Sequence, residues 1–163
     1  CMLSSMSRAF VREQDGSDVP GDVPERPVSA HQNFVTARGL QQIENRTKEL
    51  DAARDDAKAR DDQDAVSRIE RDLRYWAQRK ASAKLIEPEA TPSKVRFGVR
   101  VTVRYDDGNE RSYALVGEDE ADPAHGSISW ISPIAQALIG SSRGDDVQLQ
   151  GQHAEVVRLE SGG

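Results

Sequence analysis

A long stretch without proline constrains this chain more than any other feature. Residues 36–86 contain no proline and one glycine, Gly39. Apolar or small residues recur there at intervals of three and four, a series broken at Arg54 and Lys80: Leu40, Ile43, Thr47, Leu50, Ala57, Val66, Ile69, Leu73, Trp76 and Ala83. This heptad-like spacing predicts two helices, each with one apolar stripe.

The two stripes are separated by the polar run Arg60-Asp61-Asp62-Gln63-Asp64. A short turn at this run lets two helices of about 25 residues, each ~37 Å long, pack stripe against stripe as an antiparallel hairpin. Acidic residues four positions before basic ones, such as Glu44 before Lys48, support the exposed faces. Because the hairpin uses both stripes internally, we predict a monomer.

The segments on either side of this hairpin have a different composition. Residues 1–33 hold three prolines and two glycines among scattered acidic residues and show no periodicity, which predicts a flexible tail. Pro88 and Pro92 end the second helix. We therefore divide the chain into a flexible tail (1–33), a coiled-coil finger (34–87), a linker (88–93) and a C-terminal domain (94–160).

The C-terminal domain shows the period of β-strands. Apolar and polar residues alternate from Val95 to Tyr105, which predicts a half-buried strand. Ser132-Pro133 is a preferred helix start. The remaining strands are expected at residues 111–117, 128–131, 147–149 and 154–159. The predicted fold class is α+β, a helical hairpin followed by a small antiparallel sheet with one helix.

Composition limits the function classes. The formal net charge of −6 lacks the basic field that duplex nucleic acid requires. One cysteine, Cys1, allows no disulfide within the chain, which fits a reducing cytoplasm. No apolar run approaches the ~20 residues that span a bilayer. His31, His125 and His153 lack the spacing of a metal site or triad, and no nucleophile–base pair indicates an enzyme.

Several short motifs resemble a known family. Residues 115–122, 126–129, 132–140 and 144–145 closely resemble the C-terminal domain of the GreA/GreB family of transcription elongation factors. The segments 94–98 and 35–40 match the same family, and 6–11 resembles the start of GreB-type chains. The resemblance covers about residues 34–150.

This resemblance implies a fold, a partner and a mode of action. The fold is an antiparallel coiled-coil finger followed by an FKBP-like domain, similar to the FK506-binding proteins. The partner is bacterial RNA polymerase: the C-terminal domain docks at the rim of the secondary channel and the finger enters it. There, acidic tip residues help to hold a magnesium ion and a water, and the polymerase cleaves backtracked RNA. The chain would assist the polymerase without being an enzyme and would meet the RNA 3′ end indirectly.

The resemblance also suggests which residues act. The tip candidates are Asp61, Asp62 and Asp64, which would share magnesium with the polymerase, while the free protein needs no cofactor. Carboxylate oxygens suit magnesium and two-metal phosphoryl chemistry; a solvated turn remains the alternative. Candidate partner-binding residues are Glu118, Asp119, Glu120, Asp122, Ser132, Pro133 and Ile134. On the second helix, basic side chains that could neutralise RNA phosphates or meet acidic channel walls are Arg71, Arg74, Arg79 and Lys80; the alternative is solubility together with pairing to the first helix.

Two functions remain open at this point. The family's tip motif is not present and the finger is shorter than in cleavage-active members. The first function is stimulation of cleavage of backtracked RNA; the alternative is a non-cleaving secondary-channel regulator, similar to the regulator of nucleoside diphosphate kinase. A prolyl isomerase is not supported, because Phe97, Tyr105, Tyr113 and Trp130 are spread among strands and fold alone is poor evidence of function.

Overall fold

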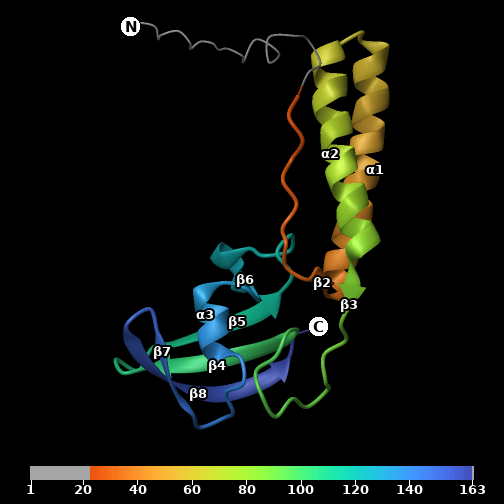
Figure 1. The fold of residues 1–163 in the computed structure, drawn as a ribbon. Helices are drawn as coiled ribbons and strands as arrows, with labels where there is room; N and C mark the ends of the chain where they lie inside the picture. The colour runs from red at the N-terminus through yellow and green to blue at the C-terminus, as the bar shows by residue number, and fades with distance from the viewer. Residues whose placement is uncertain (1–22, 163) are drawn as a thin grey trace, which may run out of the picture. The chain divides into compact units, whose positions relative to one another are not determined.

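The computed structural model describes residues 23–162 and divides the chain into two compact units (Figure 1). The first unit combines the N-terminal residues up to Ala30 with Ile43–Ala81, and the second combines His31–Gln42 with Ser82–Gly163. The GreB-like start at residues 6–11 and most of the predicted tail lie outside the described residues. The entry to the first helix, expected in the finger, belongs to the second unit.

The helical hairpin has the predicted form. Helix α1 (Ala37–Ala59) and helix α2 (Gln63–Ser82) run antiparallel, joined by a short turn (Figure 1). The stripe residues Ile43, Leu50, Ala57 and Val66 are buried, because the heptad-like spacing brings them to the facing sides of the two helices. Among the described residues, no helix is both long enough and apolar enough to cross a membrane.

Residues 23–30 differ from the predicted flexible tail, because they lie extended along α2 (Figure 1). Glu25 pairs with Arg74 and Arg26 pairs with Asp72. These ion pairs hold residues 23–30 against α2, although the composition of residues 23–30 alone does not predict an ordered segment. The sequence prediction missed this because each partner lies more than forty positions away.

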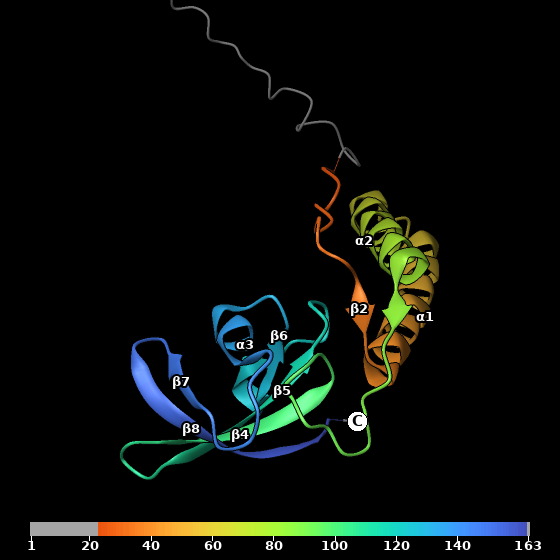
Figure 2. The same cartoon turned by 60° about the horizontal axis from the view of Figure 1, so that its bottom comes forward.

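The C-terminal unit contains a five-stranded sheet in the order β6-β5-β4-β8-β7 (Figure 2). Its strands are β4 (Val99–Tyr105), β5 (Glu110–Val116), β6 (Ser127–Ser129), β7 (Asp146–Leu149) and β8 (Gln152–Ser161). The prediction of an antiparallel sheet holds except for β5 and β6, which pair in parallel. This pair is parallel because residues 117–126, including the 3₁₀-helix η3 (Pro123–His125), carry the chain back along β5.

The first predicted strand begins later than its pattern indicates. Alternation starts at Val95, but β4 begins at Val99. Gly98 has φ +86°, a left-handed conformation that ends regular strand geometry and favours glycine. Val95 is nevertheless fully buried in the core, so its apolar character reports burial and not strand pairing.

One face of the sheet carries the core. Helix α3 (Pro133–Leu138) covers this face (Figure 2) and contributes Ala135 and Leu138, which pack with Val101, Leu115 and Val156. As predicted, Ser132 caps α3 by accepting a hydrogen bond from the Ala135 amide at 3.3 Å, and Pro133 occupies the first turn.

A short parallel pair, which the sequence did not predict, joins the two ends of the hairpin. Strand β2 (Phe34–Val35) pairs with β3 (Lys84–Leu85). The Lys84 amide donates to the Asn33 carbonyl at 2.8 Å and the Ile86 amide to the Val35 carbonyl at 3.0 Å. The base of the hairpin is thereby closed by backbone hydrogen bonds.

Candidate functional site

The turn at the tip of the hairpin holds the three predicted acidic residues. Asp61 adopts φ +57°, a left-handed conformation that aspartate tolerates better than most residues, and its carboxylate accepts from the Gln63 side chain at 3.3 Å. Asp64 lies in the first turn of α2 and makes no ion pair within the described residues. The three residues therefore share a turn but have different roles in it.

Asp62 is the residue that begins α2. Its Oδ1 accepts from the Ala65 amide at 3.1 Å, which is an N-cap, and its Oδ2 lies 3.3 Å from the Arg60 guanidinium. The backbone hydrogen bond from Ala65, aided by Arg60, lowers the pKa of Asp62. Within residues 23–162, no three His, Cys, Asp or Glu side chains are arranged to hold a metal ion. The tip residues therefore do not form a metal site by themselves.

Of the four basic residues of α2 that were predicted to contact RNA, three pair with carboxylates and the fourth is buried. Lys80 pairs with Glu44 at 3.4 Å, Arg71 with Asp72 at 3.0 Å, and Arg74 with Glu25 at 2.6 Å. Arg79 is 1% exposed, so its guanidinium is not available to nucleic acid in this conformation. A charge in the sequence does not reveal whether the chain already neutralises it.

The acidic loop after β5 includes a residue with a structural role. Glu120 Oε1 accepts from the Thr36 hydroxyl at 2.6 Å, and Thr36 Oγ1 accepts from the Gly39 amide at 2.9 Å. Thr36 is thus the N-cap of α1, and Glu120 adds a negative charge at the positive end of that helix. Glu120 lies 84 residues from Thr36 in the sequence, so no local pattern predicts this contact.

The other predicted partner-binding residues differ in how accessible they are. Asp122 pairs with His125 at 2.7 Å on an exposed turn, while Glu118 and Asp119 also have interactions of their own. Pro133 is exposed, and Ile134 is half-buried against the core. Pro133 and Asp122 therefore offer the most accessible surface among these candidates.

Aromatic rings that appear spread in the sequence gather in the structure. The Phe34 ring centroid lies 5.1 Å from that of Trp130 and 5.8 Å from that of Phe97, and His31 meets Trp130 edge-on at 6.2 Å. Phe97 and Trp130, which the sequence places far apart, therefore share Phe34 as a neighbour. The rings contact one another and hold β2 in place, which explains the cluster without a prolyl-peptide site.

Two tyrosines form a separate pair inside the sheet unit. The hydroxyls of Tyr105 and Tyr113 are hydrogen-bonded at 2.9 Å. Burial, followed by this hydrogen bond, raises the pKa of Tyr105 to about 12. A phenol that is so hard to ionise has a structural role and is unsuited to act as a general base near neutral pH.

A cavity of about 510 Å³ lies beside the start of α1 within the second unit. Its charged lining consists of two arginines and two glutamates: Arg38, Arg100, Glu87 and Glu120. The charges balance, and Glu120 is already engaged by Thr36. The lining therefore does not favour an anionic or a cationic small molecule.

His153 links the β4–β5 turn to β7 and makes stability depend on pH. Its Nδ1 lies 2.6 Å from Asp106 and its Nε2 3.0 Å from Asp146. Hydrogen bonds to Asp106 and then to Asp146 raise the pKa of His153 above its ordinary value. The stabilisation is therefore fully present below pH about 6.5 and is lost as pH rises through the raised pKa.

We expect an NMR titration to place the pKa of His153 above 6.5, and Asp106→Asn to move it down. Replacing His153 by glutamine should remove the gain in thermal stability that we expect for the wild-type chain as pH falls towards 6.5. Asp107→Asn is the matched control, because Asp107 bonds to Asn109 and not to His153. A His153 titration that is the same in Asp106→Asn would contradict this assignment.

Comparison with known proteins identifies relatives of the C-terminal half. Residues 89–160 match the family model described as transcription elongation factor, GreA/GreB, C-terminal. A GreB from Neisseria meningitidis serogroup B is 41% identical over 83 residues, which are 50% of this chain and 51% of the relative. A GreA from Helicobacter pylori is 47% identical over 72 residues, or 43% of this chain and 44% of the relative.

The chain spans about half the length of the curated relatives it matches. Among solved structures, GreA factor homolog 1 (Gfh1) of Thermus thermophilus aligns with 80% of this chain and 100% of its own, at 17% identity and a TM-score of 0.40. This score is too low to support an inference about function, so the sequence relationship of residues 89–160 is the informative result.

Proposed function

We propose that this chain belongs to the GreA/GreB family of transcription elongation factors, binds bacterial RNA polymerase and acts there through its helical hairpin, because residues 89–160 match the C-terminal model of that family. The observation that carries the proposal is the family match over the C-terminal domain, whose core and α3 are complete. The hairpin supports it, because two antiparallel helices form an elongated element suited to a narrow channel.

The proposed mode of action is occupation of the secondary channel without metal-dependent cleavage. Asp62 favours this mode, since its carboxylate is used to cap α2 and to pair with Arg60. Asp61 and Asp64 remain the tip carboxylates that a magnesium ion of the polymerase would meet. Asp61 lies in the turn and Asp64 in the first turn of α2, and these two carboxylates do not form a metal site by themselves. We therefore assign no chemical step to a metal held by this chain.

Stimulated cleavage of backtracked RNA is the second candidate function, favoured by the acidic tip itself. The decisive experiment compares wild type with an Asp61→Asn, Asp62→Asn, Asp64→Asn variant in a backtracked elongation complex. Asparagine keeps the N-cap and tolerates the left-handed position, so the variant removes charge without unfolding the turn. The matched control neutralises three carboxylates along α1, Glu49→Gln, Asp51→Asn and Asp55→Asn.

We expect wild type to bind polymerase and to compete with a known channel-binding factor, with RNA cleavage no faster than that of the polymerase alone. Cleavage that wild type stimulates, and that the tip variant but not the control loses, would replace this mode by the second candidate. Absence of binding to polymerase would refute the proposed function. Light scattering should give the mass of one chain, because stripe residues from both helices, Ile43, Leu50, Ala57 and Val66, are buried within the hairpin.

A further inference from the structure

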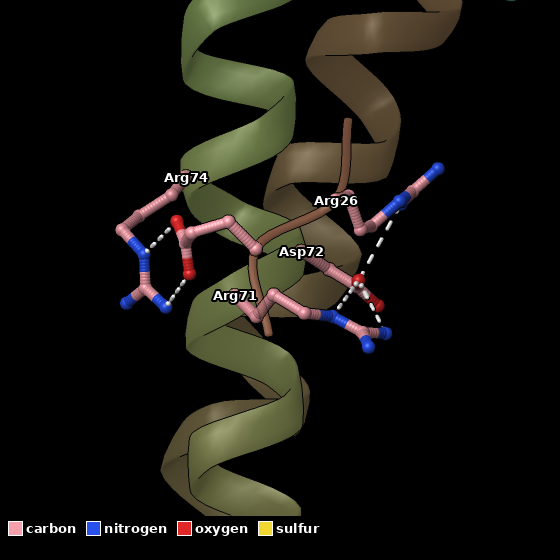
Figure 3. A network of polar contacts seen from close by, with 5 residues as sticks. Arg26, Arg71, Asp72 and Arg74 are labelled. Atoms are coloured by element: carbon pink, nitrogen blue, oxygen red, sulfur yellow. Dashed lines mark hydrogen bonds and ion pairs between the residues drawn. The ribbon is translucent and has the colours of Figure 1, made fainter. Parts of the chain in front are cut away.

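The segment that lies along α2 has a specific construction. We refer to residues 23–30 as the strap, and to Arg71, Asp72, Arg74 and Tyr75 as the latch face of α2. Figure 3 shows Arg71, Asp72 and Arg74 of this face with Arg26 of the strap. The strap and the latch face belong to the same compact unit. Pro24 and Pro27 bracket Glu25-Arg26, and proline favours the extended backbone seen here while reducing the entropy lost on ordering.

Glu25 binds the latch face through a two-point contact. Its Oε1 accepts from Arg74 Nε at 2.8 Å and its Oε2 accepts from Arg74 Nη2 at 2.6 Å. This fork geometry is the strongest arrangement between a guanidinium and a carboxylate. The same contact lowers the pKa of Glu25 and raises that of Arg74.

Arg26 binds the latch face in a different manner. Its guanidinium carbon lies 3.9 Å from the centroid of the Tyr75 ring, which is a cation–π contact. Its Nη1 lies 3.4 Å from Asp72 Oδ1, the same oxygen that accepts from Arg71 (Figure 3). The latch face therefore recognises an acidic and a basic side chain that are adjacent in an extended segment.

These contacts hold the strap without a buried core. The side chains of Glu25 and Arg74 are 57% and 52% exposed, and Val28 is 41% exposed. Solvent and salt screen ion pairs at this exposure, including the two-point contact of Glu25 with Arg74. Detaching the strap breaks ion pairs and the cation–π contacts of Arg26 with Tyr75 and, at 5.7 Å, with Trp76. The strap is therefore suited to reversible release.

We propose that the latch face is a docking surface for an extended segment of a partner protein with adjacent acidic and basic side chains, and that the strap occupies this surface as an internal competitor. A strap attached to the same chain has a high effective concentration, so a partner segment binds only when additional contacts help it. The proposal relies on the proposed function only in naming RNA polymerase as that partner.

The docking surface is tested first with a peptide. A capped peptide with the sequence of residues 23–30 is titrated into the full-length isotope-labelled chain. We expect amide signals of residues 71–76 to shift in Glu25→Gln, Arg26→Gln, where the strap is released, and not in wild type. Adding Arg74→Gln should abolish the shifts. The control is Arg104→Gln, Glu110→Gln, which breaks an exposed ion pair at 2.8 Å on the β4–β5 hairpin and should behave as wild type.

Three outcomes would overturn the proposal: equal shifts in wild type, no shifts in the strap-released chain, or shifts that only a short oligouridine produces. The last outcome would identify a nucleic-acid surface, since guanidinium and tyrosine groups also bind single strands.

A second measurement tests the competitor role on polymerase. If the strap is seated in about nine-tenths of molecules, releasing it should tighten polymerase binding about tenfold. Unchanged affinity, in a strap-released chain that binds the peptide, would contradict the competitor role. If neither wild type nor any variant binds polymerase, the proposed function is contradicted instead. The peptide titration would still show whether the latch face is a docking surface.

Discussion

Replacing Leu138 by alanine is expected to lower the free energy of unfolding of the sheet unit by about 2–5 kcal/mol. Leu138 is 0% exposed and belongs to the core cluster that joins α3 to the sheet. The substitution removes buried methyl groups and leaves a cavity that the surrounding strands fill only in part. Hydrogen exchange of the β4 and β8 amides measures the change in this unit alone.

Ile139→Ala is the matched control for Leu138→Ala. Ile139 follows in the sequence and has a side chain of the same composition, but it is 38% exposed, so its loss should have a much smaller effect. Leu138→Ala should also weaken polymerase binding, because the Ser132-Pro133 start of α3 loses its support. Equal destabilisation by both variants would contradict the assignment of Leu138 to the core.

Replacing Gly117 by alanine is expected to destabilise the same unit by about 1–3 kcal/mol. An added Cβ would lie 2.4 Å from the Phe34 carbonyl oxygen, a backbone atom that moves only if β2 moves. The substitution should therefore also displace the Phe34 ring from Trp130. Hydrogen exchange of the Lys84 and Ile86 amides, which bond to the residues around Phe34, reports this displacement.

Gly39→Ala is the informative comparison for Gly117→Ala. There the added Cβ would lie 2.7 Å from Glu120 Oε1, the end of a flexible side chain. Alanine is favoured over glycine in a helix by roughly 0.5–1 kcal/mol, which offsets the displaced hydrogen bond of Glu120 to Thr36. We expect little net change, and a loss as large as that of Gly117→Ala would show that the Glu120 contact is stronger than its exposure suggests.

The features that the sequence predicted are those governed by local patterns. The hairpin followed from the three-and-four spacing of residues such as Ile43, Leu50 and Val66, which are buried as expected. The start of α3 followed from Ser132-Pro133, because capping depends on adjacent residues. The strand that begins at Val99 was placed too early, since alternation records burial and does not register the left-handed turn at Gly98.

The features that the sequence did not predict depend on contacts between residues far apart in the chain. Glu25 and Arg74 are 49 residues apart and Thr36 and Glu120 are 84 apart, and no local pattern connects either pair. Prediction of the candidate site was limited by the same kind of long-range contact. The basic residues of α2 were recognised as charges, but the acidic groups that neutralise them, and the burial of Arg79, depend on the folded chain.

The pairing of β2 with β3 separates the length of the hairpin from the stability of the sheet unit. Since hydrogen bonds join residues 33–35 to 84–86, everything between them forms a loop whose ends meet. Adding or removing whole heptads at the far end leaves that closure intact, and the entropy of a loop grows only slowly with its length. The number of heptads in the hairpin can therefore change without altering the hydrogen bonds that close the hairpin at its base.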